Sequence, residues 1–177
     1  MRLVDLLDHS RALEERVAAL YRRFAAAQLD DRELAELWTA LAADEDEHAR
    51  SIREARCRLT SHESELTAVE GCEAALADIA ERLRHAELLA SDAMADRQLA
   101  AALDLELSEL ESLRRLGLDA SHQPGVPPPD SSHLHRLANT AMQRSSDGHV
   151  RLAAALLLAR ERLAAANSAS TRWGHHF

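Results

Sequence analysis

Residues 41–50 have the sequence Leu-Ala-Ala-Asp-Glu-Asp-Glu-His-Ala-Arg, which is the most informative stretch of the chain. Glu45 and His48 are three residues apart, so on a helix they share one face. That face continues in both directions with the alternating steps of four and three that are typical of a helix-bundle seam. Its other members are Leu34, Trp38, Leu41, Ile52, Ala55 and Leu59. The stretch therefore predicts a helix that turns a carboxylate and an imidazole toward the interior of a bundle.

Two such polar groups on a buried stripe cost free energy unless a partner compensates them. In four-helix bundles the common partner is a metal ion, which Glu-x-x-His pairs bind from facing helices. Two other interpretations stay open, namely a buried polar layer without metal and a solvated acidic face. The second arises because Asp44, Asp46 and Glu47 lie around the same helix.

The composition favours one all-α domain. Of the 177 residues, 46% are hydrophobic and only 3% are aromatic, so the apolar content is mostly Leu and Ala, which form helices well. The first glycine is Gly71 and the first proline is Pro124. The first seventy residues therefore lack strong helix breakers, as expected of an all-helical fold.

The charge pattern excludes several kinds of partner. The formal net charge is -9, and no basic patch outweighs it, so we expect no nucleic-acid partner. No stretch approaches the roughly 20 apolar residues of a membrane span, and residues 1–8 are unlike a signal peptide. We therefore expect a cytoplasmic protein without a membrane partner. In that compartment Cys57 and Cys72 are expected to be reduced thiols, although a pair across a helix hairpin stays open.

Hydrophobic periodicity predicts the order of the elements. Four bundle helices are expected over residues 2–28, 31–59, 92–117 and 131–166. The less regular segment 63–90 is interpreted as a helical crossover that lets the third helix enter from the same end as the first. A loop is expected over 121–130 and a polar tail over 167–177. The short connection between the first two helices makes them antiparallel neighbours.

The two halves of the chain look like copies of one helical hairpin. Glu14 and Glu106 each precede an Arg-Arg pair by eight residues, and His48 and His149 each precede an arginine by two. Like Glu45 and His48, the residues Glu14, Glu106 and His149 fall on the predicted inward stripes of their helices. The pattern thus predicts ligand-type side chains from four helices at one level of the bundle.

The stretch 41–50, and Glu14 with Tyr21, resemble the helix signatures of the ferritin-like superfamily and, within it, of rubrerythrin-like proteins. The resemblance implies a ferritin-like four-helix bundle built from two helical hairpins with a helical crossover. It also implies a di-iron or di-manganese carboxylate site. Carried over residue by residue, the ligands are Glu14, Glu45, His48, Glu106 and His149, with Glu45 as the bridge.

The chain departs from this signature at one position. A second Glu-x-x-His pair would have its glutamate three residues before His149, where this sequence has Ser146. Glu109, three residues after Glu106, is the carboxylate that could lean into the gap, the other interpretation being a surface acid. The remaining histidines, His133 among them, are expected at the surface. Tyr21, Phe24 and Trp38 are interpreted as core.

Two classes of function follow from the resemblance. The first is a di-iron or di-manganese enzyme that reduces peroxide or oxidises ferrous iron. It would need a separate electron donor, because the chain lacks the four-cysteine module of full rubrerythrins. The second is a non-enzymatic bundle with a degenerate site, which binds one metal ion or none and acts as an iron-handling or interaction protein. The sequence leaves open whether the protein is an enzyme and which oligomeric state it has, and proteins of the family that it resembles often form homodimers.

Overall fold

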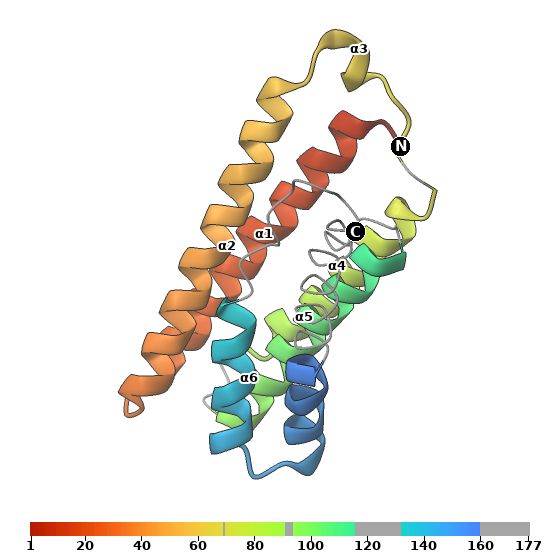
Figure 1. Ribbon diagram of the computed structural model, residues 1–177. Coiled ribbons are helices and arrows are strands. Elements are labelled where there is room, and N and C mark those ends of the chain that lie inside the picture. The colour runs from red at the N-terminus through yellow and green to blue at the C-terminus, as the bar shows by residue number, and fades with distance from the viewer. Residues whose placement is uncertain (69, 91–93, 116–131, 160–177) are drawn as a thin grey trace, which may run out of the picture.

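The computed structural model describes residues 1–68, 70–90, 94–115 and 132–159, and of residues 110–115 it describes the backbone alone (Figure 1). These residues form α1 (Leu3–Ala27), α2 (Arg32–Arg58), α3 (Ser61–Ser64), α4 (Cys72–Leu88), α5 (Ala95–Arg115), α6 (Ser132–Arg144) and a further helix over 148–159. The described part holds no β-strand, only an isolated bridge between Arg2 and Thr67. The all-α prediction is confirmed. The predicted loop over 121–130 and the tail over 167–177 lie outside the described residues.

The helices α1 and α2 form a long antiparallel hairpin, and each begins and ends within one residue of the predicted helix (Figure 1). Asp31 starts α2, because its side chain accepts a hydrogen bond from the backbone N–H of Leu34 at 3.0 Å. The apolar stripes of the two helices face each other. Their buried members include Val17, Leu20, Tyr21, Phe24, Leu34, Trp38 and Leu41. This hairpin fixes the first half of the bundle.

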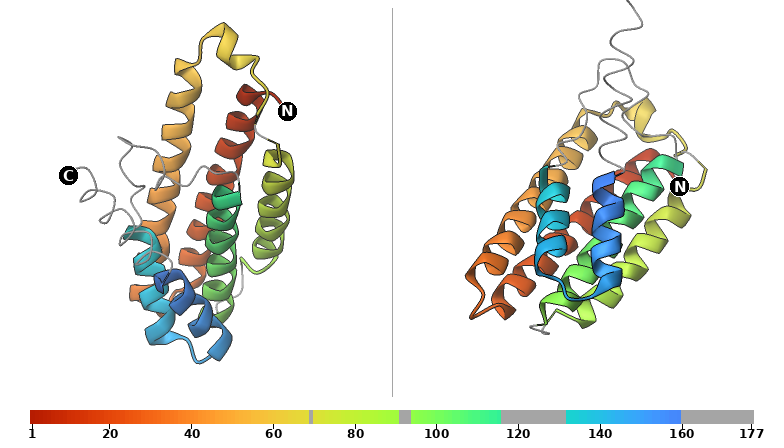
Figure 2. Two further views of the ribbon diagram at one scale, coloured as in Figure 1. Left: turned by 45° about the vertical axis from the view of Figure 1, so that its right-hand side comes forward. Right: turned by 60° about the horizontal axis from the view of Figure 1, so that its bottom comes forward.

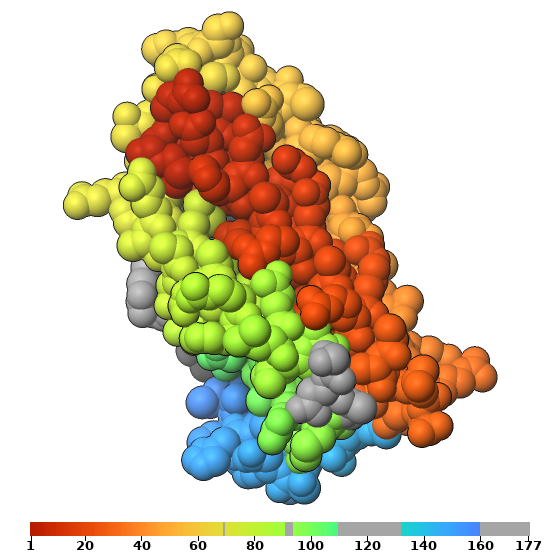
Figure 3. Space-filling model, turned by 180° about the vertical axis from the view of Figure 1, so that it is seen from behind, coloured from red at the N-terminus to blue at the C-terminus, as the bar shows by residue number. Residues whose placement is uncertain are grey.

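The segment predicted as a helical crossover contains α4, which carries the chain along the bundle and also packs as one of its helices. α4 packs against both α1 and α5, and in the view from behind it lies beside α1 along one face (Figure 3). It runs in the same direction as α1, and α5 returns antiparallel to it (Figure 1). With 17 residues, α4 carries the chain about 25 Å along the bundle. α5 therefore enters from the end opposite to the start of α1, which corrects the predicted direction.

The predicted single helix over 131–166 is wrong, because it breaks at residues 145–147. There the side-chain oxygen of Ser145 accepts a hydrogen bond from the N–H of Asp147, and Oδ1 of Asp147 accepts one from the N–H of His149. Asp147 thus caps the next helix in the usual N-cap manner. The chain reverses at this point, and α6 and the helix over 148–159 lie together at one end of the molecule (Figure 2).

An aromatic cluster lies between α1 and α2. Tyr21 stacks on Trp38 with ring centroids 5.7 Å apart, and Phe24 meets Trp38 edge-on at 5.2 Å. All three are fully buried, which confirms their interpretation as core. Cys57 is exposed and Cys72 is buried, and both are free. Among the described residues, no helix combines the length and the apolar character needed to cross a bilayer.

Candidate metal centre

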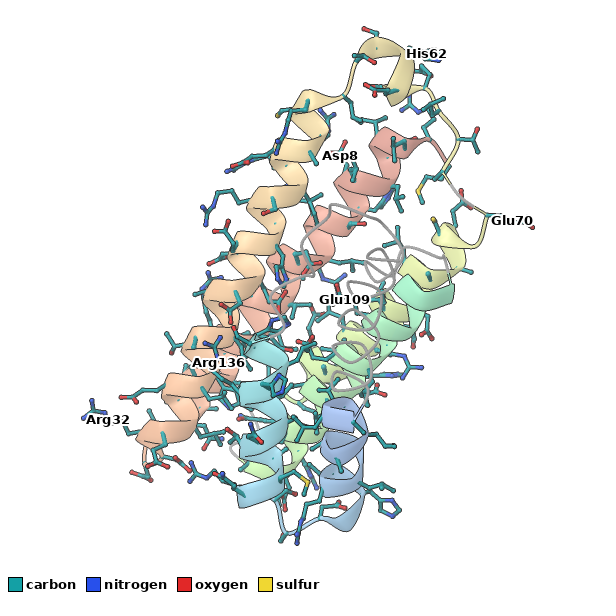
Figure 4. The ribbon with its side chains drawn as sticks, in the orientation of Figure 1. Asp8, Arg32, His62, Glu70, Glu109 and Arg136 are labelled. Atoms are coloured by element: carbon teal, nitrogen blue, oxygen red, sulfur yellow. The ribbon has the colours of Figure 1, made fainter. Side chains whose placement is uncertain are left out.

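Carboxylates and imidazoles from four helices meet in the middle of the bundle. α1 supplies Glu14, α2 supplies Glu45 and His48, α5 supplies Glu106 and Glu109, and α6 supplies His133. Figure 4 places Glu109 among the side chains at the centre of the molecule. Four carboxyl groups and two imidazoles thus share one region, which we call the carboxylate cluster.

The outer half of the cluster is formed by Glu14, Glu45 and His48, whose ligand atoms all lie within 4.8 Å of one another. His48 Nδ1 lies 3.0 Å from Glu45 Oε2 and 4.0 Å from Glu14 Oε2. The helical spacing predicted the first contact, because residues three apart share a face. The side chain of His48 is 38% exposed, whereas that of Glu45 is 3% exposed. This half therefore borders solvent through His48.

The inner half is formed by Glu45, Glu106 and His133, again with ligand atoms within 4.8 Å of one another. His133 Nε2 lies 3.7 Å from Glu106 Oε2, and the side chains of the two are 10% and 6% exposed. The rings of His48 and His133 meet edge-on at 5.3 Å. Glu45 belongs to both halves. The cluster is thus two triads that share one carboxylate.

Burial raises the pKa values of three carboxyl groups of the cluster. Desolvation raises the pKa of Glu14 and that of Glu45, which lie side by side. The pKa of Glu109 is raised to about 8, first by desolvation and then by the charges of Glu14 and Glu106. Without a cation, these carboxyl groups therefore hold protons at neutral pH. A metal ion that bound to these carboxyl groups would displace their protons.

His133 is held as a cation by its neighbours. Burial alone lowers its pKa, but the hydrogen bond to Glu106, the charge of Glu106 and the charge of Asp44 outweigh burial and raise the pKa to about 9. Glu106 is fixed from the other side by Tyr21, whose buried hydroxyl donates a hydrogen bond to Oε1 at 2.9 Å. Such outer contacts orient ligands in metal sites. Tyr21 therefore links the aromatic cluster to the carboxylate cluster.

The structure brings together five of the six predicted ligands and replaces the sixth. Glu14, Glu45, His48, Glu106 and Glu109 meet, but His149 is exposed in the helix that follows the break. Because the break changes the register, Val150, Ala154 and Leu157 are buried there instead. His133, predicted at the surface, is 8% exposed. Its position four residues before the buried Leu137 was a sequence signal that could have located it.

Ser146 lies outside the cluster, so it leaves no gap there. It is exposed, and its hydroxyl donates a hydrogen bond to Asp96 at 2.8 Å. α6 separates it from His133 by about 20 Å. We therefore expect Ser146→Glu to leave metal content unchanged, as measured by elemental analysis after anaerobic loading with Fe²⁺. A gain of metal over the unsubstituted chain would contradict the observed break.

The donor set fits a pair of divalent transition-metal ions. Carboxylate oxygens and imidazole nitrogens are the ligands that suit iron and manganese, and a metal cation that bound there would replace the protons of the buried carboxyl groups. Two triads with one shared carboxylate offer each ion three protein ligands, and Glu109 stands beside both. No protein-family model, curated protein or solved structure matches the chain. The support for the candidate metal centre is therefore the geometry of these residues.

Proposed function

We propose that the protein binds two iron or manganese ions in the carboxylate cluster. The single observation that carries this proposal is that Glu45 belongs to two triads, each with its own histidine and its own second carboxylate. Glu45 would bridge the ions, Glu14 and His48 would hold the outer one, and Glu106 and His133 the inner one. With Glu109, the set is four carboxylates and two histidines, the donor count of di-iron carboxylate bundles.

The resemblance to ferritin-like and rubrerythrin-like proteins is proposed at the level of this donor set. The four candidate ligand-bearing helices are α1, α2, α5 and α6, and α5 runs opposite to the direction predicted from the order of the segments in the sequence. The second histidine comes from the start of the last ligand-bearing helix, and the extra carboxylate comes from α5 rather than from that helix. The resemblance supports the ligand types and does not extend to the positions of the second histidine and the extra carboxylate.

The proposed chemistry is reduction of peroxide or oxidation of ferrous iron. A pair of ferrous ions held in the carboxylate cluster would together supply the two electrons that reduce hydrogen peroxide to water. The residues of this chain would provide binding and protons. The carboxyl group of Glu109, with a pKa of about 8, can hold a proton beside both triads, and His48 faces the solvent from which an oxidant arrives. Tyr21 keeps Glu106 in one orientation.

Metal stoichiometry tests the proposal. Protein purified without chelators and loaded anaerobically with Fe²⁺ is expected to hold two ions per chain, one for each triad. Air oxidation should then give the near-ultraviolet absorption of a carboxylate-bridged ferric pair. His133→Ala removes a ligand of the inner triad only, so it should reduce the content to one ion. His149→Ala is the matched control and should leave both ions bound.

The outcome that contradicts the proposal is one ion or none in the unsubstituted chain. That result would favour a bundle with a degenerate site, in which the buried carboxyl groups stay protonated. Equal effects of His133→Ala and His149→Ala would contradict the assignment of the inner triad, even if two ions bind.

A further inference from the structure

The inner triad depends on α6, which is attached to α2 by ion pairs at two levels. Arg136 pairs with Asp44, and Arg144 pairs with Asp31 through two contacts, of which Nη1 to Oδ1 measures 2.9 Å. In Figure 4 Arg136 lies where α6 meets α2. Asp44 is the chain neighbour of the shared ligand Glu45. The contact that docks α6 is therefore next to the metal centre.

The helical spacing puts these arginines on the side of α6 that carries the ligand. Arg136 is three residues after His133, and Arg144 is eleven residues after it, which is three turns of helix and about 20° of rotation. Each arginine reaches an acid of α2, so the face of His133 is turned toward that helix. The two ion pairs therefore constrain both the rotation of α6 and its position along α2.

Apolar contacts hold α6 on the bundle, but they fix its rotation and its position less sharply than the two ion pairs do. The buried residues of α6 include Leu134, Leu137, Ala138 and Ala141, and apolar burial is non-directional. A small slide or rotation would keep most of that burial while moving the imidazole of His133 away from Glu106. Charge-assisted hydrogen bonds are directional and lose energy when α6 moves.

We propose that Arg136 is a positioning residue for His133, and that the pairs Arg136–Asp44 and Arg144–Asp31 determine whether the inner half of the metal centre is assembled. This inference rests on the proposed function, because it concerns the same ligands. It adds that loss of these ion pairs should disturb the inner triad and leave the outer triad intact. The outer triad lies entirely within the α1–α2 hairpin and does not need α6.

The chain offers a matched control for Asp44. Asp46, two residues further along α2, pairs with Arg22 of α1. The side chains of that pair are 48% and 53% exposed, and those of Asp44 and Arg136 are 34% and 45% exposed. Asp46→Asn thus removes the same charge from the same helix near the centre, but it breaks a contact that does not involve α6.

The experiment measures anaerobic Fe²⁺ binding and, in metal-free protein, amide hydrogen exchange of α6. Arg136→Gln and Asp44→Asn are each expected to weaken the second Fe²⁺ equivalent about two- to fivefold, as loss of a half-exposed ion pair predicts. Both substitutions should also increase the rate of amide hydrogen exchange in α6 of the metal-free protein. The swap Asp44→Arg with Arg136→Asp should restore both values, and Asp46→Asn should change neither.

The sign of the effect separates docking from simple charge. If only the charge near the metal mattered, loss of the Asp44 carboxylate would weaken Fe²⁺ binding and loss of the Arg136 cation would strengthen it. Opposite signs, or unchanged exchange in α6, would overturn the inference. In a His133→Ala background, Arg136→Gln should have no further effect on the remaining ion, and an undiminished effect there would also overturn it.

The two proposals fail in different ways. If the unsubstituted chain binds fewer than two Fe²⁺ ions, the proposed function is wrong and the inference falls with it. If it binds two, and the variants bind them as tightly with normal exchange in α6, the inference alone is wrong.

Discussion

Glu45→Gln is expected to abolish binding of both metal ions, the largest loss from any single substitution in the carboxylate cluster. Glu45 belongs to both triads, and an amide is a neutral and much weaker ligand than a carboxylate. Loss of an outer contact to a metal ligand typically costs 10- to 100-fold in affinity, so loss of a shared ligand should cost at least about 100-fold for each ion. Anaerobic Fe²⁺ titration followed by elemental analysis measures this.

The variant should nevertheless fold. Desolvation raises the pKa of Glu45, and the charge of Glu106 raises it further, so in metal-free protein near neutral pH a neutral amide replaces a largely protonated carboxyl group. Asp46→Asn, at the exposed neighbouring position, is the control and should bind both ions. Retention of either ion at full affinity by Glu45→Gln would show that Glu45 does not bridge them.

The metal-free protein is expected to lose stability as the pH rises from about 5 to about 9. The pKa of Glu109 is about 8 and that of His133 is about 9 in the folded chain, both above their unfolded values, and the pKa values of Glu14 and Glu45 are also raised. The folded state therefore binds more protons in this window than the unfolded state does. By linkage, its stability is fully present at the acidic end and is lost as the pH increases.

The expected loss is several kcal/mol, since each unit of pKa difference corresponds to about 1.4 kcal/mol. Denaturant unfolding in the presence of a chelator, at about pH 5.5 and about pH 9, measures it. Exposed carboxylates with lowered pKa values, such as Asp31 and Glu63, lose their contribution only at pH values below this window. Glu109→Gln should reduce the difference in unfolding free energy between the two pH values. An unsubstituted chain that gains stability toward about pH 9 would contradict the prediction.

Fe²⁺ should reverse this dependence. A bound cation replaces the protons of the carboxyl groups, so binding releases protons and becomes tighter as the pH rises. Protein loaded with Fe²⁺ under anaerobic conditions is therefore expected to be stabilised most at the alkaline end, where the metal-free chain is weakest.

The α1–α2 hairpin and the positions of its candidate ligands were predictable because local rules agree there. The apolar seam, the cap at Asp31 and the three-residue step from Glu45 to His48 all indicate the same helices and the same inward face. The inward position of Glu106 was predictable from the apolar stripe of its helix. Glu109, for which a surface acid was the other interpretation, lies on the same face because the two residues are three apart on α5. In these helices the spacing along the chain is sufficient to place the side chains.

His133, the second histidine of the carboxylate cluster, was not predictable by the same reasoning. The apparent repeat aligned His149 with His48, but it ignored the side chains of Ser145 and Asp147, which compete with the helix for backbone N–H groups. Once the helix breaks, its register no longer continues, and a seam counted across the break assigns the wrong face. The position of His133 depends on how α6 docks on α2, which is set by contacts between distant segments. The packing of α4 against α1 and α5 was not predicted, because its apolar stripe is irregular.

The two triads also differ in when they can form. The ligands of the outer triad lie within residues 14–48, on one hairpin, whereas the inner triad extends from Glu45 to His133. Closing the longer segment costs more chain entropy, and the later residues leave the ribosome last. A newly made chain would therefore acquire its outer triad first and complete the inner one only after α6 has been synthesised and has docked.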